Sequence, residues 1–183
     1  MAISFTSELK ASSGDLTIPS SCRLVVALVA GTTNPTLGGV AMSQICSNGV
    51  SISIKERPTT GTVACVISQA TRFVYVNVTA TVMDSEANSH ASGSLTINVD
   101  TVIDGLVVGI ATCADGGTGA ITGITGDGGA MTYLDNYFRA HKTAADLSMA
   151  CVVSAPEPPG GQTTYGAFAS IREKKFVSKS HWW

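Results

Sequence analysis

The sequence predicts an all-β protein, an antiparallel β-sandwich of the jelly-roll kind. Two observations lead to this fold class. Apolar and polar residues alternate with a period of two along most of the chain, which is typical of half-buried strands. Clusters rich in Gly, Pro and Asn interrupt these runs at short intervals, where strands are expected to stop. About eleven or twelve strands at such spacing indicate a sandwich or jelly roll.

The individual strands follow from the same pattern. Four alternating runs predict strands with one buried face, at residues 50–55, 73–82, 95–100 and 147–153. Two runs are apolar almost throughout and predict central strands that are covered on both faces: RLVVALVA at 23–30 and GLVVGIATCA at 105–114. The segment 133–147 has no clean 3.6-residue stripe, so we expect a strand followed by a turn. No repeat is long enough to indicate a solenoid.

The length of 183 residues predicts one sandwich domain over residues 1–171, followed by a basic tail over 172–183. The tail, REKKFVSKSHWW, ends on two Trp residues, whose exposure to water would be unfavourable. The tail is therefore expected either to fold back on the sandwich or to dock on a neighbouring chain. The candidate partner-binding residues are Arg172, Lys174, Lys175, Phe176, Lys179, Trp182 and Trp183.

Composition excludes several classes of function. A net charge of -2, with 13% charged residues, offers no field for nucleic acid or for an anionic membrane. No apolar run approaches the roughly 20 residues of a membrane span, and MAISFTSELK does not look like a secretory signal. The five widely spaced cysteines contain no Cys-x-x-Cys pair, so they predict buried free thiols in a reducing cytoplasm rather than a zinc site.

The sequence contains no constellation typical of catalysis, so neither an enzyme nor a cofactor or metal site is predicted. His90, His141 and His181 each lack a matching partner in the sequence. Asp84 and Glu86 are close together, but we interpret them as solvated loop carboxylates rather than as a glycosidase pair.

The stretch DGGTGAITGITGDGGA, residues 115–130, raises three alternatives: a phosphate cradle, a calcium loop or a flexible connection. A phosphate cradle needs a following helix, whereas a strand-like run follows here and the stretch has no Lys. Asp115 and Asp127 are too few carboxylates for a calcium loop. We therefore predict a long loop at one end of the sandwich that serves as a contact surface.

An aromatic cluster in the segment 133–138 offers one possible sugar site. It combines aromatic rings with polar groups, and core packing of the rings is the favoured alternative. The residues are Tyr133, Asp135, Asn136, Tyr137 and Phe138.

Several elements follow one another in a familiar order: a hairpin at Gly38–Met42, a second Leu-Val-Val strand at Leu106–Val108, and the segments AISF, DLTIPSSCRLVVALVAG, SLTINVDTVIDGLVVGIATCAD and YGAFASIRE. This order resembles that of a group of β-sandwich domains in phage virion proteins. The segment ISIKERPTTG and the basic tail depart from that pattern.

The resemblance implies a structural role in the virion, after synthesis in the host cytoplasm. It implies a capsid decoration (cement) protein that forms a homotrimer or another homo-oligomer. Such a protein would bind the major capsid protein and stabilise the shell. The alternative that it implies is a tail-fibre or adaptor module that binds a receptor or a carbohydrate.

Overall fold

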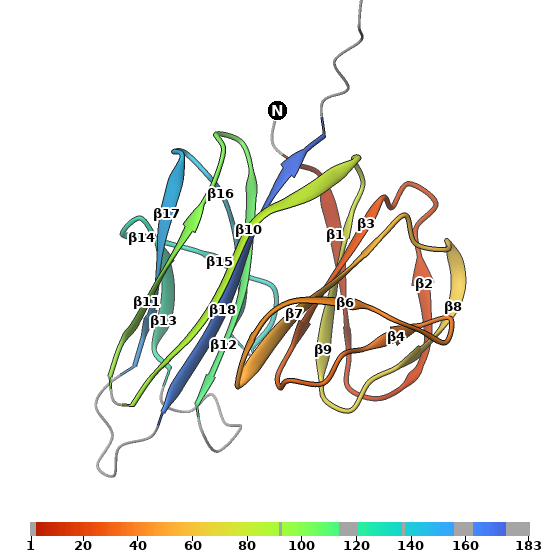
Figure 1. Cartoon of the computed structure of the whole chain (residues 1–183), viewed down its shortest axis with the longest axis horizontal. Helices are drawn as coiled ribbons and strands as arrows, with labels where there is room; N and C mark the ends of the chain where they lie inside the picture. Colours follow the sequence, from red (N-terminus) through yellow and green to blue (C-terminus); the bar gives the residue numbers. More distant parts are fainter. Residues whose placement is uncertain (1–2, 92, 114–120, 137, 156–162, 175–183) are drawn as a thin grey trace, which may run out of the picture.

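The computed structural model describes residues 3–91, 93–113, 121–136, 138–155 and 163–174. These residues form eighteen strands and no helix, and the strands make four antiparallel sheets. The predicted all-β sandwich class is therefore confirmed. The strands exceed the expected eleven or twelve because the chain forms two sandwiches that lie side by side (Figure 1).

The first sandwich contains strands β1 to β9. Its inner sheet has the order β1-β9-β3-β7-β6, and its outer sheet has the order β2-β8-β4-β5. The strands are β1 (Phe5–Lys10), β2 (Gly14–Ile18), β3 (Leu24–Val29), β4 (Thr36–Leu37), β5 (Val40–Ala41), β6 (Ser43–Asn48), β7 (Val50–Glu56), β8 (Gly61–Val66) and β9 (Thr71–Val76).

The second sandwich contains strands β10 to β18. Its inner sheet has the order β10-β18-β12-β16-β15, and its outer sheet has the order β11-β17-β13-β14. The strands are β10 (Ala80–His90), β11 (Leu95–Asp100), β12 (Leu106–Cys113), β13 (Gly123–Gly126), β14 (Gly129–Ala130), β15 (Thr132–Tyr133), β16 (Arg139–Thr143), β17 (Ser148–Ser154) and β18 (Thr164–Glu173).

The two sandwiches have the same topology. Adding nine to each strand number of the first sandwich reproduces both sheet orders of the second. Each half thus has the two Greek-key sheets of a jelly roll. The register also agrees, since Leu24 of β3 pairs with Val76 of β9, and Leu106 of β12 pairs with Ile171 of β18.

The duplication is also visible in the sequence, although the matching segments are too short to indicate a solenoid. Three short segments recur at equivalent positions of the two halves. They are Leu24–Val26 with Leu106–Val108, Thr36–Met42 with Thr125–Met131, and Ala64–Val66 with Ala150–Val152.

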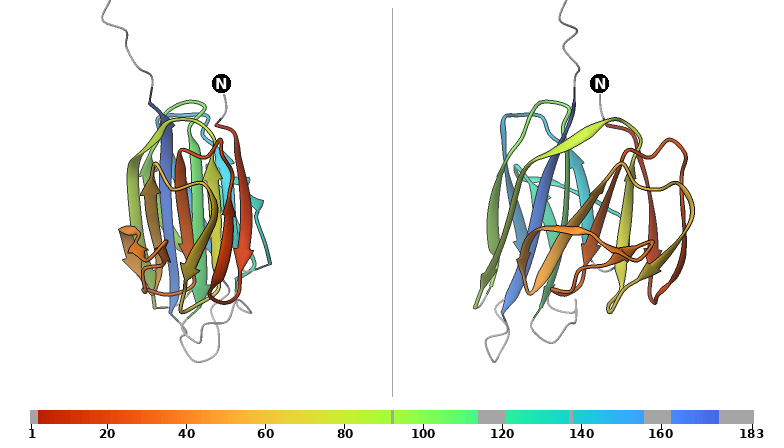
Figure 2. Two further views of the ribbon diagram at one scale, coloured as in Figure 1. Left: turned by 90° about the vertical axis from the view of Figure 1, so that its right-hand side faces the viewer. Right: turned by 45° about the vertical axis from the view of Figure 1, so that its right-hand side comes forward.

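The sheets stack in four layers, outer-inner-inner-outer (Figure 2). Apolar side chains fill the space between successive layers. A central core lies between the two inner sheets and takes residues from both sandwiches, among them Leu28 and Ile52 from the first, and Ile110 and Ile171 from the second. The strands β3 and β12 are buried along their whole length, which confirms the two predicted central strands. Because the central core is shared, each sandwich covers an apolar face of the other.

Two expected elements differ from the structure. The run 73–82 is not one strand, because β9 ends at Val76 and β10 begins at Ala80, so the run crosses the junction between the sandwiches. The stretch 115–130 is not one long loop. Its second part forms the hairpin of β13 and β14, with Asp127 and Gly128 at the turn, both at positive φ. Residues 114–120 lie outside the described residues.

Candidate functional site

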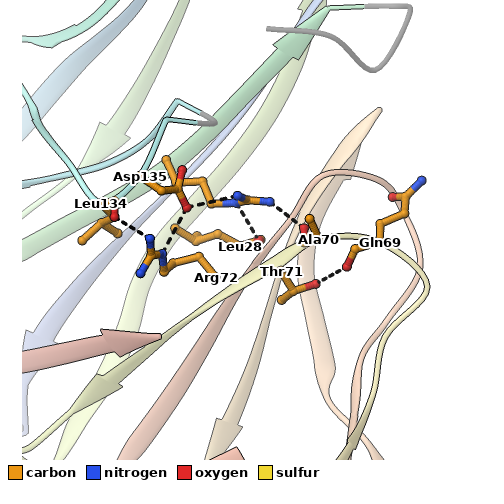
Figure 3. Close-up of polar contacts among 8 residues, drawn as sticks. Leu28, Gln69, Ala70, Thr71, Arg72, Leu134 and Asp135 are labelled. Carbon is orange, nitrogen blue, oxygen red and sulfur yellow. Dashed lines mark hydrogen bonds and ion pairs between the residues drawn. The ribbon is translucent and has the colours of Figure 1, made fainter. Parts of the chain in front are cut away.

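A cluster of buried charged groups lies between the two sandwiches. It joins Arg72 of β9, in the first sandwich, to Asp135 and Arg139 of the second. The Arg139 side chain is fully buried, and the side chains of Asp135 and Arg72 are 6% and 12% exposed. We call these three residues the inter-sandwich cluster; Figure 3 shows Arg72 and Asp135 within it.

The Asp135 carboxylate is the centre of this cluster. Its Oδ2 accepts hydrogen bonds from Arg72 Nε and from Arg139 Nη1, each at 3.1 Å. Backbone carbonyls surround the two guanidinium groups. Arg139 donates to Leu28 O at 3.2 Å and to Ala70 O at 2.5 Å, while Arg72 donates to Leu134 O at 2.5 Å. The contacts of Arg72, which Figure 3 shows, therefore cross from one sandwich to the other, and so do the bonds of Arg139 to the two carbonyls.

The duplication identifies what the cluster replaces. Ile52 pairs with Leu28 in the first sandwich, and Arg139 pairs with Ile110 at the equivalent place in the second. Counting from the equivalent Met42 and Met131, Asp135 corresponds to Cys46, the β6 partner of Ile52. An ion pair thus stands where the other half has two uncharged side chains at the edge of the central core.

The turn before β16 directs Arg139 into this position. Phe138 has a φ of 50°, in the left-handed region that residues other than glycine rarely adopt. Its ring packs edge-on against Tyr133, with centroids 5.5 Å apart, and contacts the second sandwich's core. We infer that this packing offsets the strain of the turn.

The predicted sugar site is not assembled as expected. The Asp135 carboxylate is held by two guanidinium groups between the sandwiches, so it is not presented to a ligand. Tyr133 is 45% exposed, and its hydroxyl accepts a hydrogen bond from Ile124 N. Asn136 is exposed, and Tyr137 lies outside the described residues.

Asp84 and Glu86 lie in strand β10, not in the loop that the sequence predicts. The two oxygens of Asp84 accept hydrogen bonds from the backbone N–H groups of Ser85 and Asp100, each at 2.8 Å. Asp84 therefore ties β10 to the end of β11, a structural role.

The predicted free thiols are confirmed. The five cysteines, Cys22, Cys46, Cys65, Cys113 and Cys151, are unbridged, and Cys46 is half-buried while the others are buried. Burial raises the pKa of Cys22 and Cys65 to about 11, and that of Cys46 and Cys151 to about 12. These four groups are therefore neutral thiols at physiological pH, and poor nucleophiles.

The described part of the tail is fixed to the body. Arg172 lies within β18, which extends to Glu173, and Lys174 N donates to Thr79 O at 2.7 Å. The other predicted partner-binding residues lie outside the described residues: Lys175, Phe176, Lys179, Trp182 and Trp183. His181 lies there too.

No group of three or more potential metal ligands occurs among the described side chains. The same part of the chain contains no helix that could cross a membrane.

His141 lies on β16 with its ring against Phe5 of the first sandwich, at a centroid distance of 4.7 Å. Burial lowers the pKa of this imidazole below its usual 6.5. The unfolded chain therefore binds the proton more tightly than the folded one. We expect the free energy of unfolding to be insensitive to His141 above about pH 6.5, and to fall as the pH decreases below that value.

The matched variant is His141→Ile, because Ile54 occupies the equivalent position on β7. Urea unfolding at pH 7.5 and 5.5 measures the effect, and the loss of stability between these pH values should be smaller in the variant. Equal losses in both proteins would contradict the assignment to His141.

Comparison with known proteins gives little further information. No protein-family model matches the chain, and no curated protein matches it. Among solved structures, it is similar to a conserved protein of unknown function from Pseudomonas aeruginosa PAO1, with 11% identity and a TM-score of 0.41. That similarity covers 91% of this chain and 80% of the other. A likeness at this level carries no argument about function.

Proposed function

We propose that the chain is a structural protein of a phage particle, a capsid decoration (cement) protein. It forms a homotrimer or another homo-oligomer and binds neighbouring major capsid subunits. The order of the sequence elements supports the proposal through their resemblance to virion sandwich domains. The observation that carries it furthest is that the buried charges hold two sandwiches together as one body. A close-packed body of four layers transmits strain rather than absorbing it, as a protein that stiffens a shell must.

The tail is the proposed attachment segment. Its first residues are anchored, since Lys174 bonds to Thr79 and its Nζ lies 3.6 Å from Glu56 Oε1. The start of the chain is close by, because Asn77 N donates to Ser4 O at 3.1 Å. The residue that precedes the segment 175–183 is therefore held in place on the body.

Deletion of residues 175–183 is expected to abolish binding to capsids that lack this protein. The melting temperature should change little, because the bond of Lys174 to Thr79 is retained. Co-sedimentation measures the binding, and calorimetry the stability. Light scattering of the intact and truncated proteins, against the chain mass of 18.7 kDa, separates loss of docking from loss of oligomerisation.

A matched variant replaces Trp182 and Trp183 with alanine and keeps the basic residues. Loss of binding in both proteins assigns the attachment to the indoles, and loss only in the deletion assigns it to the rest of the tail. Unimpaired binding by the deletion variant would rule out the tail as the attachment segment. The carbohydrate-binding alternative relied on the carboxylate of Asp135, which is bound within the inter-sandwich cluster. We therefore do not propose it further.

A further inference from the structure

The two sandwiches differ in the space between the short hairpin of the outer sheet and the inner sheet, which we call the mouth of each sandwich. In the first sandwich the hairpin is β4–β5, and in the second it is β13–β14. A lysine lies below each hairpin on the inner sheet. Lys55 pairs with Val25, and Lys142 pairs with Val107 at the equivalent register. A lysine side chain therefore lies at the equivalent position in the mouth of each sandwich.

In the second sandwich this lysine closes the mouth. Lys142 Nζ donates to the carbonyls of Gly126 and Gly129 in the hairpin. A larger side chain at either position would crowd this lysine. A Cβ on Gly129 would lie 2.9 Å from Lys142 Nζ, and a Cβ on Gly126 would lie 3.3 Å from Lys142 Cδ and 2.6 Å from Met149 Sδ. The ammonium group thus has backbone partners and fills the space.

In the first sandwich the equivalent hairpin positions are Leu37 and Val40. Their side chains occupy the place where the second sandwich has only hydrogen atoms. Lys55 forms no hydrogen bond or ion pair within the described residues, and a pocket of about 390 Å³ lies at this mouth. Small-molecule sites in proteins have volumes of roughly 300–1,000 Å³.

The lining of this pocket combines one charged residue with apolar side chains and two threonines, Thr59 and Thr62. Ile18, Leu37, Val40 and Val63 supply the apolar surface, with Thr59 beside them. Lys55 is its charged lining residue, and the neighbouring Glu56 pairs with Lys174. No carboxylate among the described lining residues neutralises Lys55. Lys55 is half-buried as a residue, and its ammonium group favours an anionic ligand over a neutral one.

We propose that this pocket binds a carboxylate carried on a short aliphatic chain. The carboxylate accepts from the Lys55 ammonium, as the two hairpin carbonyls do from Lys142. The aliphatic part contacts Leu37, Val40 and Val63. The carboxylate can belong to a free aliphatic acid or to the C-terminus of a peptide. The inference concerns a pocket formed by residues of the body, and it does not depend on the proposed virion role.

The test is a titration of the full-length protein with hexanoate, followed by NMR chemical shifts. Hexanol is the uncharged control. A second pair of probes is acetyl-Ala-Val-Leu with a free and with an amidated C-terminus. We expect saturable shifts at millimolar concentration for at least one of the two carboxylates. Binding should be about tenfold weaker for its uncharged counterpart, since a hydrogen bond to a charged group is lost.

Three variants make the test specific. Lys55→Met should weaken carboxylate binding about tenfold, and Lys142→Met should leave it unchanged. The double variant L37G/V40G copies the second sandwich, so Lys55 should reach the hairpin carbonyls and binding should be lost. Thermal unfolding of each variant checks that it is folded. If the double variant does not fold, Lys55→Met alone tests the role of the lysine.

Saturation by hexanoate assigns the site to free acids, and saturation by the peptide acid alone assigns it to a C-terminus. Absence of binding by both carboxylates would overturn the proposal. Equal affinity for the charged and uncharged members of a pair would also overturn it.

Discussion

Replacement of Arg139 by alanine is expected to lower the free energy of unfolding by about 3–5 kcal/mol. The guanidinium is fully buried and binds Asp135, Leu28 O and Ala70 O. Its removal leaves the Asp135 carboxylate between the sandwiches with Arg72 as the remaining cation of the cluster. Urea unfolding followed by fluorescence and circular dichroism measures the change, with the slope checked against wild type.

The double variant D135A/R139I distinguishes a buried ion pair from ordinary packing. Each single substitution breaks the contact between Asp135 and Arg139, and the double substitution removes both of its groups, while Arg72 keeps the carbonyl of Leu134 as a partner. Isoleucine is the residue that the first sandwich uses at this position, Ile52, so the space accepts it. We expect the loss of stability in the double variant to be smaller than the sum of the losses in D135A and R139I, because the two groups contact each other.

A surface pair provides the control for this cycle. Lys10 Nζ lies 3.0 Å from Glu8 Oε1, and both side chains are partly exposed. Lys10→Ala should therefore cost no more than about 1 kcal/mol. Losses that simply add in D135A/R139I would contradict the view that the cluster acts as one unit.

The faces of individual strands could be predicted from the sequence, because a strand's side chains alternate regardless of its partners. In β11, for example, Leu95, Ile97 and Val99 are buried, as the alternation predicts. The break between β9 and β10 could not be found this way. Asn77, Val78 and Thr79 contain neither Gly nor Pro, so the apolar alternation continues through the junction.

The inter-sandwich cluster could not be predicted from local pattern either. Arg72 and Asp135 are distant in sequence, and Asp135 lies in a turn rich in aromatic residues, where a carboxylate is usually solvated. The duplication, in contrast, could be predicted from the sequence. The Thr-x-x-Gly-x-Ala-Met match at Thr36 and Thr125 was a signal for it, but the unequal lengths of the other segments hid the period.

Separation of the chain between β9 and β10 is expected to abolish folding of both parts. The fragments 1–78 and 79–183 would each keep one complete outer and inner sheet pair. Each would also expose its half of the central core, including Leu28 and Ile52 in the first fragment and Ile110 and Ile171 in the second. A fragment of this size has little stability in reserve and cannot leave such a face in water.

The measurement compares each fragment alone, the two co-expressed fragments, and a full-length chain cleaved at a protease site inserted after Val78. The fragments alone should show no cooperative unfolding. The co-expressed and cleaved proteins should remain associated through the central core and the inter-sandwich cluster, and should unfold in one transition. Because the central core is shared, the intact chain should also unfold in a single transition, with the same midpoint by fluorescence and by circular dichroism.

The cleaved protein is the essential control, because it carries the same new chain ends as the fragments. If it stays folded while the fragments do not, the ends are harmless and the shared core is what each fragment lacks. Cooperative unfolding of an isolated fragment would instead define two domains, and the predicted single domain over 1–171 would be wrong. The central core makes that outcome unfavourable, because its apolar residues come from both sandwiches and are nearly inaccessible to water.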